Sequence, residues 1–88
     1  MSSHAALTVR QVHVLRVIRQ QECPTIRVIS EASGVSRSTA QAAAMGLLRK
    51  GLVGQGPSGF GPGATFHLTD AGRELLRHLD TLESRPRE

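Results

Sequence analysis

The chain has 88 residues, of which 39% are hydrophobic and 20% charged, so it fits one small folded domain with little room for an enzyme cleft. Phe60 and Phe66 are the only aromatic residues, which argues against RNA-binding modules that stack bases on exposed rings. The net charge of +4 divides into +5 for residues 1–50 (seven basic, two acidic) and −1 for residues 51–88 (four basic, five acidic). The positive half predicts a polyanionic partner, with a solvated basic face as the alternative.

Disulfide, metal and membrane functions find no support in the sequence. Cys23 is the single cysteine, so an internal disulfide or a cysteine-based zinc finger is excluded, and the four histidines lack metal-ligand spacing. We interpret Cys23 as a small apolar filler and leave a redox role open. No apolar run approaches the roughly 20 residues that span a bilayer, and the first ten residues lack the apolar core of a signal peptide. We therefore expect no metal, no cofactor and no membrane contact, in a cytoplasmic protein.

A first helix is predicted to begin at Thr8, after a disordered lead over residues 1–6. Thr8 and Gln11 have the Thr-x-x-Gln spacing of a capping box. Pro24 disfavours helix in the residue before it, so the helix ends before Cys23. Apolar residues at helical spacing predict the inward face, made of Val12, Leu15 and Ile18 with Val14 beside them.

Two further helices follow, separated by a tight turn at Gly34. Thr25 can cap a short helix over residues 26–33, and Ser36 can cap a third helix that extends to Lys50. Gly34 suits the left-handed backbone that often ends a helix. The inward side chains expected in these two helices are Ile29, Ala32, Ala40, Ala43 and Leu47.

The second half of the chain predicts a β-hairpin and a last helix. Residues 52–55 indicate a short strand, and residues 64–68 a half-buried strand in which apolar and polar residues alternate. Residues 56–63 contain four glycines and two prolines, so they form the loop between the strands. Thr69 and Asp70 can cap the last helix, because the hydroxyl accepts a backbone N–H and the carboxylate complements the helix dipole.

The segment from Ile26 to Met45 has the pattern of a helix-turn-helix, in which small residues let two short helices cross closely. Over about residues 7–80 the chain resembles the winged helix-turn-helix of the multiple-antibiotic-resistance regulator (MarR) family. The matching residues are Leu7, Thr8, Gln11 and Leu15, then Ile29, Ser30 and residues 34–39, then Leu47, Gly51, Leu52 and Val53, and finally residues 68–73. The resemblance implies a mainly α fold with a small β-hairpin: a three-helix core, a wing hairpin and a C-terminal helix. It also implies sequence-specific binding of duplex DNA as a homodimer.

Three features depart from the family pattern. Only six residues precede Leu7, where the family has an additional N-terminal helix. Residues 54–67 contain no Lys or Arg, where the family wing usually carries basic residues. The chain also has little volume for the small effector that many members bind. We therefore predict a minimal winged helix without a small-molecule effector, with Phe60 of the wing folded onto the domain rather than wedged into the minor groove.

The third helix is the predicted recognition helix, whose outward side chains would reach into the major groove. Gln41 can pair bidentately with adenine, and Arg37 can bind guanine or a phosphate. Arg27, on the preceding helix, can bind a phosphate, as can short hydroxyls near the helix start, while apolar side chains can meet thymine methyl groups. The expected DNA-binding residues are Arg27, Ser36, Arg37, Ser38, Gln41, Ala42 and Met45.

The last helix carries more leucines than a three-helix core and a hairpin can bury. Leu75, Leu79 and Leu82 recur at helical spacing and form one stripe, and Leu76 lies beside it. An exposed leucine stripe is a liability for a small monomer, so it predicts a homodimer held by this helix. Val9 and Val17, on the outer side of the first helix, would extend the same surface. The alternative is a monomer whose last helix folds back onto its own first helix.

These features predict a sequence-specific DNA-binding protein and a homodimeric transcriptional regulator, a repressor rather than an activator. Residues 7–69 form the winged-helix domain, residues 70–84 the dimerisation helix and residues 85–88 a frayed tail. One alternative is a protein-interaction winged helix that uses an exposed Met45 and Leu48. Another is an architectural or accessory DNA binder from a plasmid, phage or recombination system. We expect no enzyme, because no nucleophile–base arrangement, phosphate loop or paired acidic cluster is present.

Overall fold

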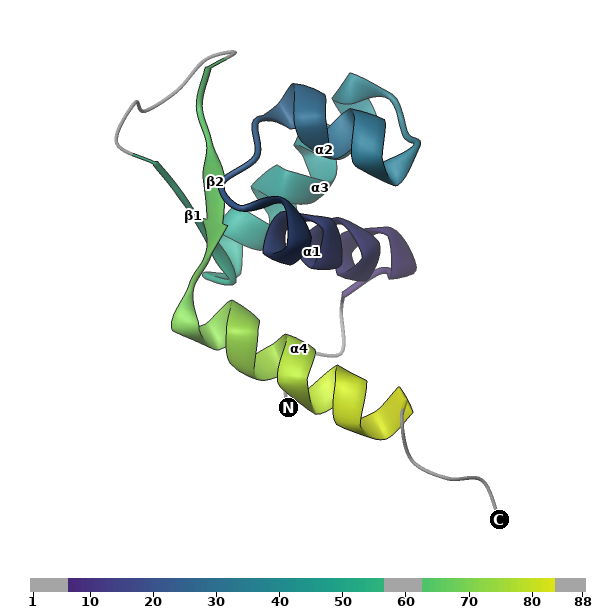
Figure 1. Ribbon diagram of the computed structural model, residues 1–88, viewed down its shortest axis with the longest axis vertical. Coiled ribbons are helices and arrows are strands. Elements are labelled where there is room, and N and C mark those ends of the chain that lie inside the picture. Colours follow the sequence, from purple (N-terminus) through teal and green to yellow (C-terminus); the bar gives the residue numbers. More distant parts are fainter. Residues whose placement is uncertain (1–6, 57–62, 84–88) are drawn as a thin grey trace.

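The computed structural model describes residues 7–56 and 63–83, which form four helices and a two-stranded antiparallel hairpin (Figure 1). The elements are α1 (Val9–Gln21), α2 (Ile26–Ser33), α3 (Arg37–Arg49), β1 (Val53–Gln55), β2 (Phe66–Leu68) and α4 (Asp70–Glu83). The predicted mainly α fold with a hairpin between the third and fourth helices is confirmed. The predictions of a disordered lead at residues 1–6, a folded-back Phe60 and a frayed tail at residues 85–88 lie outside the described residues.

Side-chain caps start the first three helices as predicted. The backbone N–H of Gln11 donates to Thr8 Oγ1 and the N–H of Thr8 donates to Gln11 Oε1, both at 3.0 Å, which completes a capping box. The hydroxyls of Thr25 and Ser36 each accept a backbone N–H three residues later, at 3.4 and 3.2 Å. Because these caps satisfy N–H groups that have no partner within the helix, local sequence suffices to place the helix starts.

The turn between α2 and α3 depends on Gly34, whose φ of 77° lies in the left-handed region that favours glycine. The N–H of Gly34 donates to the carbonyl oxygen of Ser30 at 3.0 Å. The Ser30 hydroxyl donates to the carbonyl oxygen of Val35 at 2.6 Å. Ser30 is one of the small residues that allow the two helices to cross closely, and its hydroxyl also ties the turn to α2. These bonds fix the direction in which α3 leaves α2.

The core lies between the four helices and the hairpin, and among the described residues it is aliphatic apart from Phe66. The predicted inward side chains that the structure buries are Val14, Leu15, Ile18, Ile29, Ala40, Ala43 and Leu47. Val12 is only partly buried. Ala44, which the helical spacing did not place inward, is fully buried because α3 packs against α1, α2 and β1 and is covered over a wide arc.

Four other predicted orientations are wrong. Val17 is 5% exposed rather than outward, because α1 contacts α2, α3, β2 and α4 and so is covered on more than one side. Ala32 is exposed rather than inward, since the short α2 reaches the core through Ile29 and Ile26. Met45 and Leu48 are partly buried and pack against the core, because of the same wide cover over α3.

The paired strands of the hairpin are bonded to each other and to the segment before α2. Val53 pairs with Leu68 and Gln55 with Phe66 in the antiparallel register. Both β2 partners are buried and the residue between them is exposed, as the alternation predicts. The N–H of Phe66 also donates to the carbonyl oxygen of Pro24 at 2.9 Å, just before α2 begins. The wing is therefore bonded directly to the segment that leads into α2.

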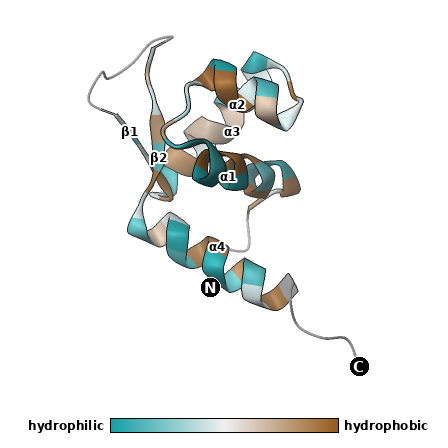
Figure 2. Ribbon diagram, viewed as in Figure 1, coloured by the Kyte–Doolittle hydropathy of each residue, from teal (hydrophilic) through white to brown (hydrophobic). Residues whose placement is uncertain are grey.

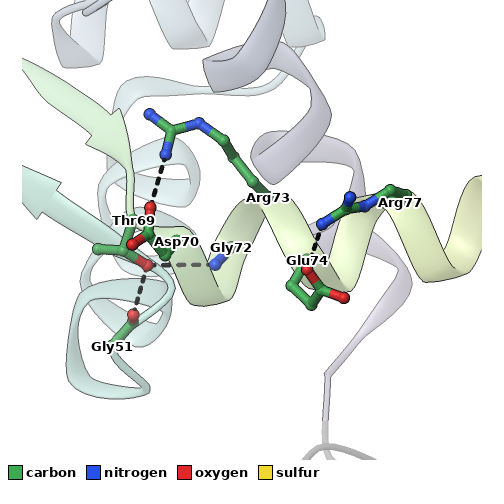
Figure 3. Close-up of polar contacts among 7 residues, drawn as sticks. All are labelled: Gly51, Thr69, Asp70, Gly72, Arg73, Glu74 and Arg77. Atoms are coloured by element: carbon green, nitrogen blue, oxygen red, sulfur yellow. Dashed lines mark hydrogen bonds and ion pairs between the residues drawn. The ribbon is translucent and has the colours of Figure 1, made fainter.

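Thr69 joins the hairpin to α4. Its hydroxyl donates to the carbonyl oxygen of Gly51 at 2.7 Å and accepts the N–H of Gly72 at 3.1 Å (Figure 3). The backbone N–H of Thr69 donates to the carbonyl oxygen of Leu52 at 3.1 Å. A Cβ on Gly72 would overlap that same carbonyl oxygen, so glycine is what lets α4 begin this close to the hairpin. The segment from Thr69 to Gly72 thus fixes where α4 starts.

Helix α4 packs against α1 of its own chain, with hydrophobic residues recurring between hydrophilic ones along its length (Figure 2). Leu76 is 0% exposed, which corrects its assignment to a dimer interface, because it fills the protomer's own core. Asp80 lies 2.8 Å from Arg19 and 3.6 Å from Arg16, both on α1. Two further leucines, Leu75 and Leu79, are partly buried against the core, and Leu82 is 47% exposed.

Candidate nucleic-acid interface

The exposed face of α3 carries most of the residues assigned to DNA. The exposed members are Ser36, Arg37, Ser38, Gln41 and Ala42. Met45 does not belong with them, because it is partly buried and packs against the core. Arg37 and Gln41 have long side chains, and the other exposed side chains of this group are short. A partner surface can therefore approach the helix backbone closely, with two long polar side chains reaching into it.

The hydroxyls at the start of α3 form a hydrogen-bonded group. Ser36 Oγ accepts the backbone N–H of Thr39 at 3.2 Å and donates to Thr39 Oγ1 at 2.9 Å. Ser38 Oγ lies 3.3 Å from Ser36 Oγ. Ser36 is therefore occupied as the helix cap. Ser38 is the hydroxyl better placed to contact a partner.

The basic residues differ in whether a carboxylate neutralises them. Arg27 lies with its Nε 3.4 Å from Glu31 Oε2, one helical turn later in α2. The arginines of α4 are paired as well: Arg73 with Asp70, and Arg77 with Glu74 (Figure 3). Arg37 pairs with no acidic residue in the part of the chain that the structure describes. The start of α3 therefore carries a positive charge without a neighbouring carboxylate. The arginines named on α2 and α4 are instead neutralised by carboxylates of their own helices.

An open hollow of about 490 Å³ lies between the start of α1 and the exposed face of α3. Its lining residues include Thr8, Arg10, Gln11, Ser38, Thr39 and Ala42, and we refer to it as the α1–α3 hollow. Gly46 of α3 lies so close to the Gln11 amide that a Cβ would overlap it, which shows how closely the two helices approach. Sequence reasoning missed Arg10 because its neighbours in the hollow lie on a helix far along the chain. The signal available was its place in the first turn after the Thr8 cap.

Other kinds of site find little support in the described residues. Among residues 7–56 and 63–83, no group of three or more His, Cys, Asp or Glu side chains could hold a metal ion. No helix in these ranges combines the length and apolarity needed to cross a bilayer. Cys23 is exposed, so its interpretation as an apolar filler is wrong. The chain leaves α1 through Glu22 and Cys23, both with positive φ (51° and 53°) and both exposed.

A three-helix core, a wing hairpin and an exposed polar third helix define a winged helix-turn-helix. The model of the MarR family matches residues 7–55, more than half of the chain, and the protein therefore belongs to this family. Members of the family are transcription regulators rather than enzymes. The resemblance inferred from the sequence is thus confirmed. Among curated proteins, no sequence matches this chain.

Solved structures of the family share the fold. FabT of Streptococcus pneumoniae, solved in complex with DNA, has a TM-score of 0.79 at 23% identity, over 93% of this chain and 58% of its own. The multiple antibiotic-resistance repressor of Listeria monocytogenes has a TM-score of 0.78 at 23% identity, over 90% and 53%. PcaV of Streptomyces coelicolor, solved with its natural ligand, has a TM-score of 0.72 at 27% identity, over 84% and 53%. This chain thus spans a little over half the length of these proteins.

The expectation that a small-molecule effector is absent is not upheld by these comparisons. PcaV, one of the similar structures, was solved with its natural ligand. The expectation rested on the small volume of an 88-residue chain. The length of a chain limits the size of an enclosed cavity but not that of an open hollow between helices. One such hollow lies beside α3.

Proposed function

We propose that this protein is a homodimeric transcription regulator that binds a specific duplex DNA sequence with α3 in the major groove. The observation that carries the proposal is the exposed face of α3, with Gln41 projecting from it and Arg37 unpaired among the described residues, in a chain of the MarR family. We place the protein in the cytoplasm, on the nucleoid. Repression is the outcome we favour, because a protein bound at a promoter excludes others from it.

Two side chains of α3 supply the reading of bases. Gln41 offers one donor and one acceptor, which match N7 and N6–H₂ of adenine in the major groove. Arg37 offers a donor fork that matches O6 and N7 of guanine, or a phosphate. Ser38 can donate to a phosphate, and Ala42 can contact a thymine methyl group. Arg27 remains a candidate phosphate contact, and it would have to break its ion pair with Glu31 to bind a phosphate of the DNA.

Replacing Gln41 with alanine is expected to weaken binding to the cognate duplex by about 1–3 kcal/mol, roughly 5- to 150-fold, and to leave binding to random duplex unchanged. The reason is that a base contact contributes only where the correct base is present. Arg37→Ala tests the same face: loss of a phosphate contact lowers both affinities equally, and loss of a guanine contact lowers the cognate one. Fluorescence anisotropy with both duplexes measures each case.

Gln20→Ala is the matched control, because Gln20 is an exposed glutamine on α1. It should change neither affinity. A Gln41→Ala variant that keeps its full preference for the cognate duplex would show that α3 does not read bases through this residue.

We propose further that two copies of the chain associate through the outer side of α4. Leu82 is exposed, Leu75 and Leu79 are partly exposed beside it, and Val9 of α1 is 87% exposed. A two-fold dimer would place two recognition helices about 34 Å apart, one turn of DNA, on a near-palindromic site. Because Leu76 belongs to the protomer core, this interface contains three of the four leucines that the sequence predicted for it.

Leu82→Asp is expected to convert the dimer to a monomer at micromolar concentration, because the carboxylate would lose its hydration in the interface. Sedimentation velocity measures the change. Leu82 is preferable to Leu79 for this test, since Leu79 also packs against the protomer's own core. Thr81→Asp, an exposed change on the same helix, should leave the dimer intact. A monomeric wild-type protein would remove the dimer from the proposal.

The alternative of a protein-interaction winged helix loses its main support. It depended on Met45 and Leu48 being exposed, and both are partly buried against the core. An architectural or accessory DNA binder would use the same α3 face. It differs from a regulator in biology rather than in the chemistry of the interface.

A further inference from the structure

Arg10 is a cation on α1 that no acidic residue neutralises among those the structure describes. Its side chain is exposed. On the same helix, Arg16 and Arg19 instead pair with Asp80 of α4. An arginine without a carboxylate partner gives up no ion pair when it binds an anion. Arg10 can therefore bind an external anion at lower cost than these neighbours.

The surroundings of Arg10 place that anion beside the proposed DNA-reading face. Arg10 lines the α1–α3 hollow together with Ser38 and Ala42 of α3, two of the residues assigned to DNA. The start of α1 and the turn between α2 and α3 lie on the same side of the molecule (right in Figure 1). An occupant of the hollow would thus lie against the edge of the surface that we assign to the major groove.

We propose that the α1–α3 hollow binds a backbone phosphate of the DNA, held by the Arg10 guanidinium. The inference rests on the proposed function, because the duplex that lies along α3 has to supply the phosphate. The phosphate strands border the major groove, so a helix within the groove has phosphates at its edges. The hollow lies at such an edge and carries the charge that matches a phosphate.

The chemistry of the hollow suits a phosphate diester. The planar guanidinium of Arg10 can donate two parallel hydrogen bonds to its two non-bridging oxygens. Thr8 and Thr39 add hydroxyls to the lining, and the small side chain of Ala42 leaves room for the group. A contact from α1 in addition to those from α3 would add affinity for any duplex, because every duplex supplies backbone phosphates. Arg10 is thus a phosphate-binding residue, not a base-reading one.

Arg10→Gln tests the proposal through the salt dependence of duplex binding. Loss of one phosphate contact reduces the slope of log K against log [salt] by about 0.9 per protomer, or about 1.8 per dimer. Between 50 and 200 mM salt the wild-type protein should then lose about 12-fold more affinity than the variant. The preference for cognate over random duplex should stay unchanged. Arg77→Gln, which removes the same charge from an arginine paired on α4, should leave the slope as it is.

A second measurement uses the DNA. Single methylphosphonate linkages, which are uncharged, are placed one at a time along each strand of the cognate duplex. One position per half-site should weaken the wild-type protein, and the same position should have no further effect on Arg10→Gln, because one contact cannot be removed twice. Thermal unfolding of the variant, unchanged from the wild type, shows that the fold is intact.

The outcomes separate this inference from the proposed function. Sequence-specific binding with an unchanged salt slope in Arg10→Gln would overturn the phosphate site and leave the α3 interface in place. Wild-type protein that binds no duplex would overturn both. Stabilisation of the wild type by millimolar inorganic phosphate, lost in Arg10→Gln while the DNA salt slope stays unchanged, would show that the hollow takes a free anion and not the backbone.

Discussion

Gly72→Ala is expected to destabilise the domain by about 3 kcal/mol, at the upper end of the cost of overpacking a tight contact. Alanine is normally the better helix residue by about 1 kcal/mol, so the sign of the effect is opposite to the usual one. The reason is that a Cβ at this position would overlap the backbone carbonyl oxygen of Leu52, which cannot move without breaking its bond with the Thr69 N–H. For a domain of this size the melting temperature should fall by roughly 12–24 °C.

Gly63→Ala is the matched control, because a Cβ there would meet no heavy atom within 4 Å. Its melting temperature should stay within a few degrees of the wild type. A Gly72→Ala variant as stable as the Gly63→Ala variant would show that α4 does not begin against the backbone of Leu52. The junction drawn in Figure 3 would then not hold α4 in place.

Duplex binding by the wild-type protein is expected to fall by about 10³-fold or more between 50 and 200 mM salt. A dimer whose unneutralised cations contact roughly six to eight phosphates releases a corresponding number of counterions. The described basic residues without an acidic partner in the structure are Arg10, Arg37, Arg49 and Lys50. Titrations of one duplex at a series of salt concentrations measure the slope directly.

A slope near zero would contradict electrostatic binding of a polyanion by this surface. The comparison variant is Arg73→Gln, since Arg73 is paired with Asp70 on α4 and is not one of the residues assigned to DNA. It should retain the wild-type slope. A protein whose slope depended on Arg73 as much as on Arg37 would use a different face.

Local sequence rules place the elements of this fold, because the signals that start and stop its helices act within a few residues. The Thr8 capping box, the Thr25 and Ser36 caps and the turn at Gly34 all occur where the sequence predicts them. Burial is harder to predict, since it depends on how many neighbours each helix has. Val17 is the clearest case. Helical spacing predicts a single inward stripe on α1 that leaves Val17 outside it, but four elements contact α1 and Val17 is buried.

The candidate site shows the same division. The exposed positions of α3 follow from helical spacing, apart from Met45, which the wide cover over α3 partly buries. The pairing of Arg27 with Glu31 was readable in the sequence, because residues four apart share a helix face. The position of Arg10 beside Ser38 was not readable in the sequence, because it results from the packing of α1 against α3.

The most direct test of the account is a scan of the cognate duplex with 7-deazaadenine, which replaces the N7 acceptor of one adenine at a time. Gln41 is proposed to bind this acceptor in the major groove. We expect one adenine in each half-site at which the substitution weakens wild-type protein by about 1–3 kcal/mol but has no further effect on Gln41→Ala. If no adenine responds, or if the responding adenines weaken Gln41→Ala equally, the exposed face of α3 does not read DNA as proposed.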